Sequence, residues 1–491
     1  MNENVKIMKN DGLKHQASRG ALWGLSSNLG VSAISFVGTA ILARMLSPKD
    51  FGLLGMAVLI MGIVQLFGNL GLGAALIHKK NIDNSYLSTA FWSSLIVSVA
   101  LTLGSVILAP FASIFFKEPV VKWIVIVISM NFIISSSASI HRTLLYKDIR
   151  MKNIAIIEIA SRFVRVIIMI VCALAGWGFW SIVIGFIGEG ILKTSLFVVT
   201  VKWIPTFQFN KTKFDELFHY GKNIYGQGFV NYFNQNMDFI VTGRLLGASL
   251  LGFYQFSFNL PYLVKSYVQD GVGPVAFSAF SKVQDDNQRL TRGFLNAVKY
   301  VSIIVFPAMF GLAFCADDFI SVVYGTRWLP SSDPLKLLCF SAALASVHCV
   351  VYALFNAKGR PDIGLKWGLF ILPITITSVV YFSRWGIIGI AIAMFFMEVF
   401  TTFIAYIATR LLKVVFKSYL IALLPAIYSS LIMTTALYVI NNKLLLIDNI
   451  YLRFIFNIFI GVVIYAASLF IFYKKDAIST IEFIGPSLKT G

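Results

Sequence analysis

The chain has 491 residues, of which 58% are hydrophobic and 13% are charged, and its mean hydropathy is +0.80. One soluble core cannot bury so much apolar surface, so the composition excludes a soluble globular protein and predicts a membrane protein. The net charge of +19 does not indicate nucleic-acid binding, because the basic residues lie in loops between apolar segments and no polar segment is long enough to form a soluble domain.

Fourteen apolar segments are each long enough to cross the hydrocarbon core of a bilayer as an α-helix. They cover residues 20–43, 51–77, 87–113, 119–140, 153–176, 178–201, 222–243, 251–277, 294–316, 334–356, 364–383, 385–409, 418–441 and 452–473. We therefore expect an all-α polytopic membrane protein, in which two six-helix pseudo-repeated lobes and two C-terminal helices surround a central cavity. The expected parts are a cytoplasmic basic tail (1–19), an N-terminal lobe (20–201), a cytoplasmic interfacial linker (202–220), a C-terminal lobe (221–410), two extra helices (411–473) and a cytoplasmic tail (474–491).

Lysine and arginine concentrate in alternate connections between these segments. By the positive-inside rule this bias places both termini in the cytoplasm. The first segment is too long for a signal-peptide core and lacks a convincing cleavage site, so we expect it to be retained as a helix. Four cysteines lie in or beside apolar segments without metal-ligand spacing, and no phosphate-cradling loop is present in the sequence. Neither a metal nor a cofactor is predicted. Because the sequence predicts no domain that could hold a nucleotide, transport would be secondary, driven by an ion gradient, the membrane potential or substrate supply.

The first segment carries a polar stripe that begins with Asn28, and the motif after it recurs 200 residues later. The matching pairs are Arg44 and Arg244, Leu46 and Leu246, Gly52 and Gly252, Gly71 and Gly271, and Gly73 and Gly273. The repeat predicts two related halves, each of which opens with a polar-faced helix.

The fifth and sixth segments carry charges near the middle of the membrane. Glu158 precedes Arg162 by four residues, and Glu189 precedes Lys193 by the same step, so each helix can neutralise part of its own charge. Arg165 remains as a surplus cation in the fifth segment, where it needs an anionic partner. The sequence leaves two interpretations open for Arg162 and Arg165: structural ion pairs, or binding of an anionic substrate.

The seventh segment carries one polar face. Five polar residues recur at steps of three or four, which stacks them on one side of a helix. They are Asn223, Gln227, Asn231, Asn234 and Asp238. Such a stripe faces either a water-filled cavity or polar partners on neighbouring helices. We favour the cavity and assign the four amides, together with Asn28, to the lining of a substrate-binding site.

Later segments add isolated charges. Lys265 in the eighth segment is either a cavity cation or a partner of Asp238 or Asp270, and Glu398 is a lone acid in the twelfth. The acids Asp238, Glu158, Glu189, Asp270 and Glu398, which lie in apolar segments, are candidates for ion coupling.

A family resemblance rests on two short motifs and one loop. These are Ala43, Arg44, Leu46, Ser47, Pro48, Phe51 and Gly52, then Gly71 and Gly73, and the loop from Asn356 to Pro361. On these residues the chain resembles the polysaccharide-transporter branch of the multidrug, oligosaccharidyl-lipid and polysaccharide exporter superfamily, and within it Wzx-type flippases and colanic- or teichuronic-acid exporters. The resemblance implies a non-enzymatic flippase in a bacterial cytoplasmic membrane. Its substrate would be an undecaprenyl-pyrophosphate-linked oligosaccharide for O-antigen, capsule or exopolysaccharide, and its partners would be membrane lipids, a polysaccharide polymerase and glycosyltransferases.

Three other functions stay open at this point. An ion-coupled multidrug exporter of the same superfamily would need a dominant acid in the cavity and usually twelve spans. A membrane-bound glycosyltransferase would need a large outer loop, whereas the outer loops here are short. A lipid II flippase is a closer rival within the favoured class, and glycosyltransferase genes beside this one would instead indicate a surface polysaccharide.

Overall fold

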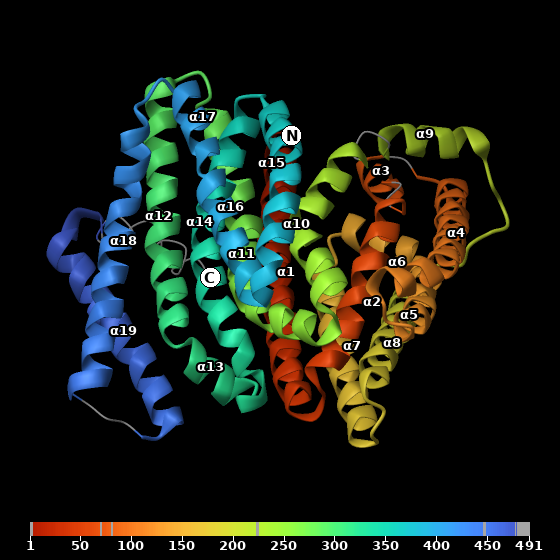
Figure 1. The fold of residues 1–491 in the computed structure, drawn as a ribbon. Coiled ribbons are helices and arrows are strands. Elements are labelled where there is room, and N and C mark those ends of the chain that lie inside the picture. The colour runs from red at the N-terminus through yellow and green to blue at the C-terminus, as the bar shows by residue number, and fades with distance from the viewer. Residues whose placement is uncertain are drawn as a thin grey trace. The chain divides into compact units, whose positions relative to one another are not determined.

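The computed structural model describes residues 3–68, 71–79, 82–221, 225–444, 448–476 and 478. Side chains are described for the same residues except 3–18, 21, 25, 217–221, 225–227, 443 and 444. All secondary structure in these ranges is helical (Figure 1), which confirms the all-α membrane fold.

By its contacts the chain divides into two compact units, each described here by itself. The first comprises residues 1–232 and 247–252, and the second comprises residues 233–246 and 253–491. The predicted domain boundaries remain predictions, as does the cavity expected between the lobes.

The first unit contains the helices of the predicted N-terminal lobe and the linker. These are α1 (Glu3–Met45), α2 (Pro48–Leu66), α3 (Leu72–His78), α4 (Asn84–Phe116), α5 (Val120–Ser136), α6 (Ser139–Lys147), α7 (Met151–Leu174), α8 (Phe179–Val201) and α9 (Lys211–Gly221).

The second unit contains most of α10 (Tyr225–Leu246) and α11 (Ala248–Lys282), and all later helices. These are α12 (Asn287–Phe314), α13 (Ala316–Val323), η2 (Thr326–Ser331), α14 (Ser332–Ala357), α15 (Pro361–Phe382), η3 (Ser383–Trp385), α16 (Gly386–Thr401), α17 (Phe403–Leu411), α18 (Phe416–Val439), η4 (Ile440–Leu444) and α19 (Ile450–Phe472).

Every predicted segment is helical in its described residues, but two of them are not straight. The second segment ends as α2 and resumes as α3 after Gly71, whose φ of +65° is readily adopted only by glycine. The fourth segment is the pair α5 and α6, which bend by 46° at their junction.

Length and composition alone qualify nine helices of the described chain as membrane spans, or ten if the bent pair counts as one. The segment Pro361–Leu411 is counted once although it contains α15 and α16. Three further long helices, α7, α10 and α11, are not among those that qualify, and they carry most of the charged and amide side chains that the sequence singles out. The total of fourteen spans therefore remains a prediction.

Helix α7 lies between α1 and α8 in the first unit (Figure 1), and glycines bring both neighbours close to it. A Cβ atom at Gly38 of α1 would lie 2.6 Å from Val166, and one at Gly185 of α8 would overlap Met169. Small residues allow helices to approach closely in a membrane. The charged side chains of α7 are consequently held against α8.

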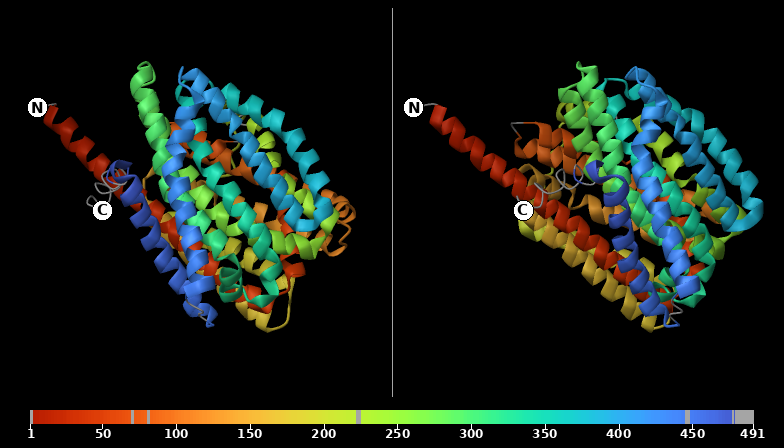
Figure 2. Two further views of the ribbon diagram at one scale, coloured as in Figure 1. Left: turned by 60° about the vertical axis from the view of Figure 1, so that its left-hand side comes forward. Right: turned by 90° about the vertical axis from the view of Figure 1, so that its left-hand side faces the viewer.

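In the second unit, α18 packs along α12, and α19 packs on α18 (Figure 2). Arg453 at the start of α19 makes two hydrogen bonds to Asp318 of α13, and Tyr465 donates to the carbonyl oxygen of Ile303. Near the end of the chain, Lys299 pairs with Asp476 at 2.7 Å. The two C-terminal helices are thus tied to the second unit along their length.

Candidate functional site

A cluster of six charged side chains lies where α6, α7 and α8 meet. Arg162 and Arg165 of α7 reach Glu189 of α8 at 3.2 Å and 3.0 Å. Glu158 of α7 lies 2.8 Å from the ammonium of Lys193 on α8, and Arg142 of α6 approaches the same carboxylate at 3.5 Å. The ion pairs of α7 and α8 therefore run between helices. The expected neutralisation within each helix is wrong, because the tight packing of α7 on α8 turns the opposite charges toward each other.

Four cations surround only two carboxylates in this cluster. The side chains of Arg165 and Glu189 are each 12% exposed, so their mutual attraction is weakly screened by water. The Arg165 guanidinium also lies over the Phe186 ring, 3.5 Å from its centre. Nε of Arg162 is buried, and its contact with Glu189 at 3.2 Å is an ion pair without hydrogen-bond geometry. The cluster thus keeps two positive charges that its own acids do not neutralise.

The structure describes only part of the polar stripe on α10. Asn223 and the side chain of Gln227 lie outside the described residues. Asn231 is exposed, whereas Asn234 donates a 3.1 Å hydrogen bond to the backbone oxygen of Gly368 in α15. Asp238 is buried and accepts a hydrogen bond from Tyr254 of α11. In the second unit the stripe therefore makes interhelical hydrogen bonds, and its role in a substrate cavity remains a prediction.

Lys265 of α11 is half-buried, and its positive charge acts on the carboxylates of both Asp238 and Glu398. Asp270 lies exposed about one turn further along α11, and Asn28 is exposed on α1. Of the partners that the sequence offered for Lys265, Asp238 is the one whose carboxylate its charge reaches, although the two form no ion pair among the described contacts.

Sequence reasoning missed His348 of α14. Its Nδ1 atom lies 3.2 Å from a carboxylate oxygen of Glu398, and its side chain is 4% exposed. The signal that could have found it is the lone acid itself, because a buried carboxylate in a membrane needs a partner.

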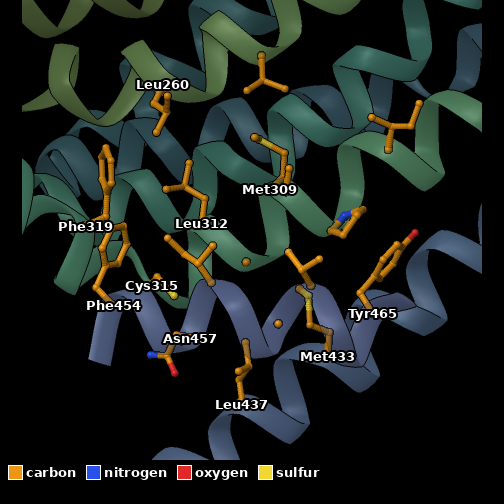
Figure 3. A pocket seen from close by; sticks show the side chains of 18 residues that line it. Leu260, Met309, Leu312, Cys315, Phe319, Met433, Leu437, Phe454, Asn457 and Tyr465 are labelled. Carbon is orange, nitrogen blue, oxygen red and sulfur yellow. The ribbon is translucent and has the colours of Figure 1, made fainter. Parts of the chain in front are cut away.

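An apolar pocket of about 570 Å³ lies in the second unit between α11, α12, α18 and α19. Leu260, Met309, Met433 and Val462 are among the apolar side chains that line it, and Figure 3 shows side chains from these helices converging on it. Its polar members are engaged elsewhere, since Asn457 accepts a hydrogen bond from Asn441. A pocket of this kind suits a hydrocarbon chain.

The linker folds back on the beginning of α4 in the first unit. Glu216 of α9 accepts hydrogen bonds from Lys79 and Tyr86, and Lys213 pairs with Asp83 at 2.6 Å. The hydrogen bond from Lys79 lowers the pKa of Glu216 and raises the pKa of Lys79 itself, while the bond from Lys213 lowers the pKa of Asp83. Beside these contacts Phe207 is 93% exposed, as suits an aromatic residue at a membrane surface.

No three histidine, cysteine or carboxylate side chains come together as metal ligands in the described part of the chain. The polar side chains that the structure brings together are the cations and carboxylates of α6, α7 and α8 and the amide and carboxylate of α10.

The helical fold of this chain is one that solved lipid flippases and multidrug transporters share. The structure matches the lipid II flippase MurJ in an inward closed conformation with a TM-score of 0.74 and 16% identity, over 93% of this chain and 99% of that chain. An inward-facing multidrug resistance transporter of the MATE family matches with a TM-score of 0.60 and 14% identity, over 78% of this chain and 95% of that chain.

Residues 41–333 match the family described as polysaccharide biosynthesis protein, and the chain belongs to that family. Among curated relatives, the lipopolysaccharide biosynthesis protein WzxC of Escherichia coli (strain K12) is 24% identical over 85% of this chain and 86% of its own length. The teichuronic acid biosynthesis protein TuaB of Bacillus subtilis (strain 168) is 26% identical over 72% of this chain and 73% of its own length. The predicted membership of the polysaccharide flippase branch is confirmed.

Proposed function

We propose that this protein is a secondary transporter that flips an undecaprenyl-pyrophosphate-linked oligosaccharide across a bacterial cytoplasmic membrane by alternating access. The product would serve the synthesis of a surface polysaccharide: O-antigen, capsule or exopolysaccharide. The observation that carries the proposal is the cation surplus between α7 and α8, in a chain of the polysaccharide biosynthesis family. Two uncompensated positive charges inside a membrane protein are costly unless an anionic ligand uses them.

Arg162 and Arg165 would bind the anionic part of the substrate, which is its pyrophosphate or an acidic sugar. A guanidinium group presents a planar fork of donors that suits phosphate oxygens. Nε of Arg162 pairs with Glu189 at 3.2 Å without hydrogen-bond geometry, so an anionic ligand would compete with Glu189 for this donor. Glu189 would keep both guanidinium groups in place while the site is empty.

The amides of α10 with Asn28, and Lys265, would contact the sugar headgroup, while Asp238, Glu158, Glu189, Asp270 and Glu398 remain the candidates for ion coupling. The lipid tail requires apolar surroundings. The pocket between α12 and α19 offers them, because its lining is apolar and its polar members are already hydrogen-bonded. We therefore assign this pocket to part of the polyprenyl chain.

Both termini would be cytoplasmic, and α9 would lie at the inner surface with the exposed Phe207 against the headgroups. In this orientation the substrate would bind on the side where lipid-linked sugars are assembled. Glycosyltransferases and a polysaccharide polymerase would act before and after the flipping step. No enzymatic step is assigned to the chain itself.

The decisive experiment deletes the gene and follows both the cell-surface glycan and the lipid-linked intermediates on each leaflet. Loss of surface polymer, with completed repeat units retained on the inner leaflet, would establish the flippase and identify its substrate. Accumulation of lipid II with normal polysaccharide would indicate a lipid II flippase. Unchanged glycan with new sensitivity to cationic compounds would indicate a drug exporter and contradict the proposal.

A further inference from the structure

The second unit contains a buried histidine, His348, in contact with the partly buried Glu398. His348 lies in α14, nine residues before the helix ends at Ala357. At a rise of 1.5 Å per residue this is about 14 Å from the helix end, near the middle of a hydrocarbon core roughly 30 Å thick. Two titratable side chains at this depth need a reason to be there.

Both ring nitrogens of His348 have polar neighbours. Nδ1 lies 3.2 Å from Oε2 of Glu398, and Nε2 lies 3.4 Å from the hydroxyl of Thr402. The same hydroxyl also lies 3.2 Å from the backbone oxygen of Glu398. A single hydroxyl hydrogen can serve only one of these acceptors.

This arrangement satisfies His348 in two protonation states. When the ring is neutral, Nδ1–H donates to Glu398 and the Thr402 hydroxyl donates to Nε2. When the ring is protonated, Nε2–H donates to the oxygen of Thr402, whose hydrogen turns to the backbone oxygen of Glu398. A proton can therefore arrive and leave while each buried nitrogen keeps its hydrogen bond.

The surrounding charges make the two protonation states of His348 differ in the net charge of the cluster. Lys265 acts electrostatically on Glu398 and on Asp238, and the hydroxyl of Tyr352 is also near enough to interact with Glu398. With both carboxylates ionised, Lys265 balances one of them, and a proton on His348 balances the other. Other charged groups on the elements around α14 and α16 have partners of their own: Lys299 with Asp476, Lys336 with Asp317 and Asp333, Lys366 and Arg360 with Asp362, Arg410 with Tyr406, and Arg384 over Tyr381.

We infer that His348 and Glu398 form a proton-binding site, and that a proton taken up there from the outer side and released to the cytoplasm drives the flipping step. Loss of the proton leaves one uncompensated negative charge in a buried cluster, which disfavours the packing of α14 against α16. Thr402, between α16 and α17, has a helical backbone and donates its N–H to the carbonyl oxygen of Glu398, so both partners of the His348 ring belong to one continuous span. The inference deepens the proposed function and rests on it for the transport step only.

The proton site is tested first without any substrate. Purified protein is labelled with ¹⁵N-histidine, and the ring signal of His348, one of five histidines, is assigned by its loss in His348→Gln. We expect both the neutral and the protonated ring to be observed as the pH is varied, and Glu398→Gln to change the balance between them, because the carboxylate that contacts Nδ1 is gone. A ring that keeps one protonation state, or a balance that Glu398→Gln leaves unchanged, would overturn the inference.

The coupling is tested in proteoliposomes with lipid-linked oligosaccharide extracted from the host. A pH gradient, acid on the outer side, should accelerate flipping by the wild type several-fold, and His348→Gln and Glu398→Gln should both lose this acceleration. His141→Gln is the matched control, because His141 is equally buried but contacts a backbone oxygen of Trp203. Flipping that ignores the pH gradient would overturn the coupling and leave the proposed function intact. A wild type that flips nothing would overturn the proposed function, and the ring titration would still decide the proton site.

Discussion

Gly52 of α2 and Gly252 of α11 make reciprocal backbone contacts. A Cβ atom at Gly52 would overlap the carbonyl oxygen of Ala248, and one at Gly252 would overlap the carbonyl oxygen of Pro48. Each glycine thus lies against the backbone of the residue four positions before the other. The repeat seen in the sequence is therefore also a contact in the structure.

Gly52→Ala and Gly252→Ala should each destabilise the protein, although alanine is the better helix former. The added methyl group meets a backbone carbonyl that cannot rotate away, and overpacking typically costs about 1–3 kcal/mol. Thermal unfolding of the purified protein measures the effect. Gly104→Ala in α4 is the control, since a Cβ there meets nothing within 4 Å and should gain up to about 1 kcal/mol. Equal stability of all three variants would show that the crossing is not tight.

Arg162→Ala and Arg165→Ala should each abolish surface-polymer export while the protein level stays normal. Each change removes a charged donor from the proposed anion site, and hydrogen bonds to charged groups contribute about 1.5–3 kcal/mol, so reconstituted flipping should fall at least about tenfold. Arg150→Ala, at an exposed position just before α7, serves as control. Normal export in both variants would leave these arginines with a purely structural role.

Ala308→Trp should slow flipping by filling the apolar pocket. Ala308 lines the pocket from α12, and an indole would occupy the space that we assign to the polyprenyl chain. Ala467→Trp places the same side chain at an exposed position of α19 and should leave the flipping rate near that of the wild type. The two rates are compared in proteoliposomes, and equal rates would exclude the pocket from the lipid path.

The linker should detach from α4 in acid. Because hydrogen bonds lower the pKa of Glu216 and of Asp83, their attachment is complete above the ordinary values of 4.5 and 3.8 and is lost as pH falls through the lower folded values. At alkaline pH the raised pKa of Lys79 has the corresponding effect. Its contribution to the attachment is lost only above the ordinary lysine pKa of 10.5. Hydrogen exchange in residues 202–216 should therefore stay slow at neutral pH and rise at both extremes, beyond the intrinsic dependence of exchange on pH.

Glu216→Gln should release the linker already at neutral pH, because the amide cannot form the ion pair with Lys79. Asp215→Asn removes the neighbouring exposed carboxylate and should not change the exchange rate. If both variants exchange like the wild type, Glu216 does not hold the linker.

Hydrophobic length in the sequence was enough to place every long helix, because a helix that crosses a bilayer must hide its backbone polar groups and present about 20 apolar residues. The repeat of Gly52 and Gly252, and the charges of α7 and α8, were visible for the same reason: glycine and buried charge are conspicuous in an apolar background.

What only the tertiary structure decided is the choice of partner. The spacing of Glu158 and Arg162 favoured pairs within a helix, but the packing of α7 against α8 brought Arg162 to Glu189. Glu398 read as a lone acid because His348 lies fifty residues earlier in a helix that reads as apolar. Local spacing reports only neighbours on one helix, whereas the low dielectric of a membrane protein rewards whichever opposite charge the packing brings nearest, however distant it is in the chain.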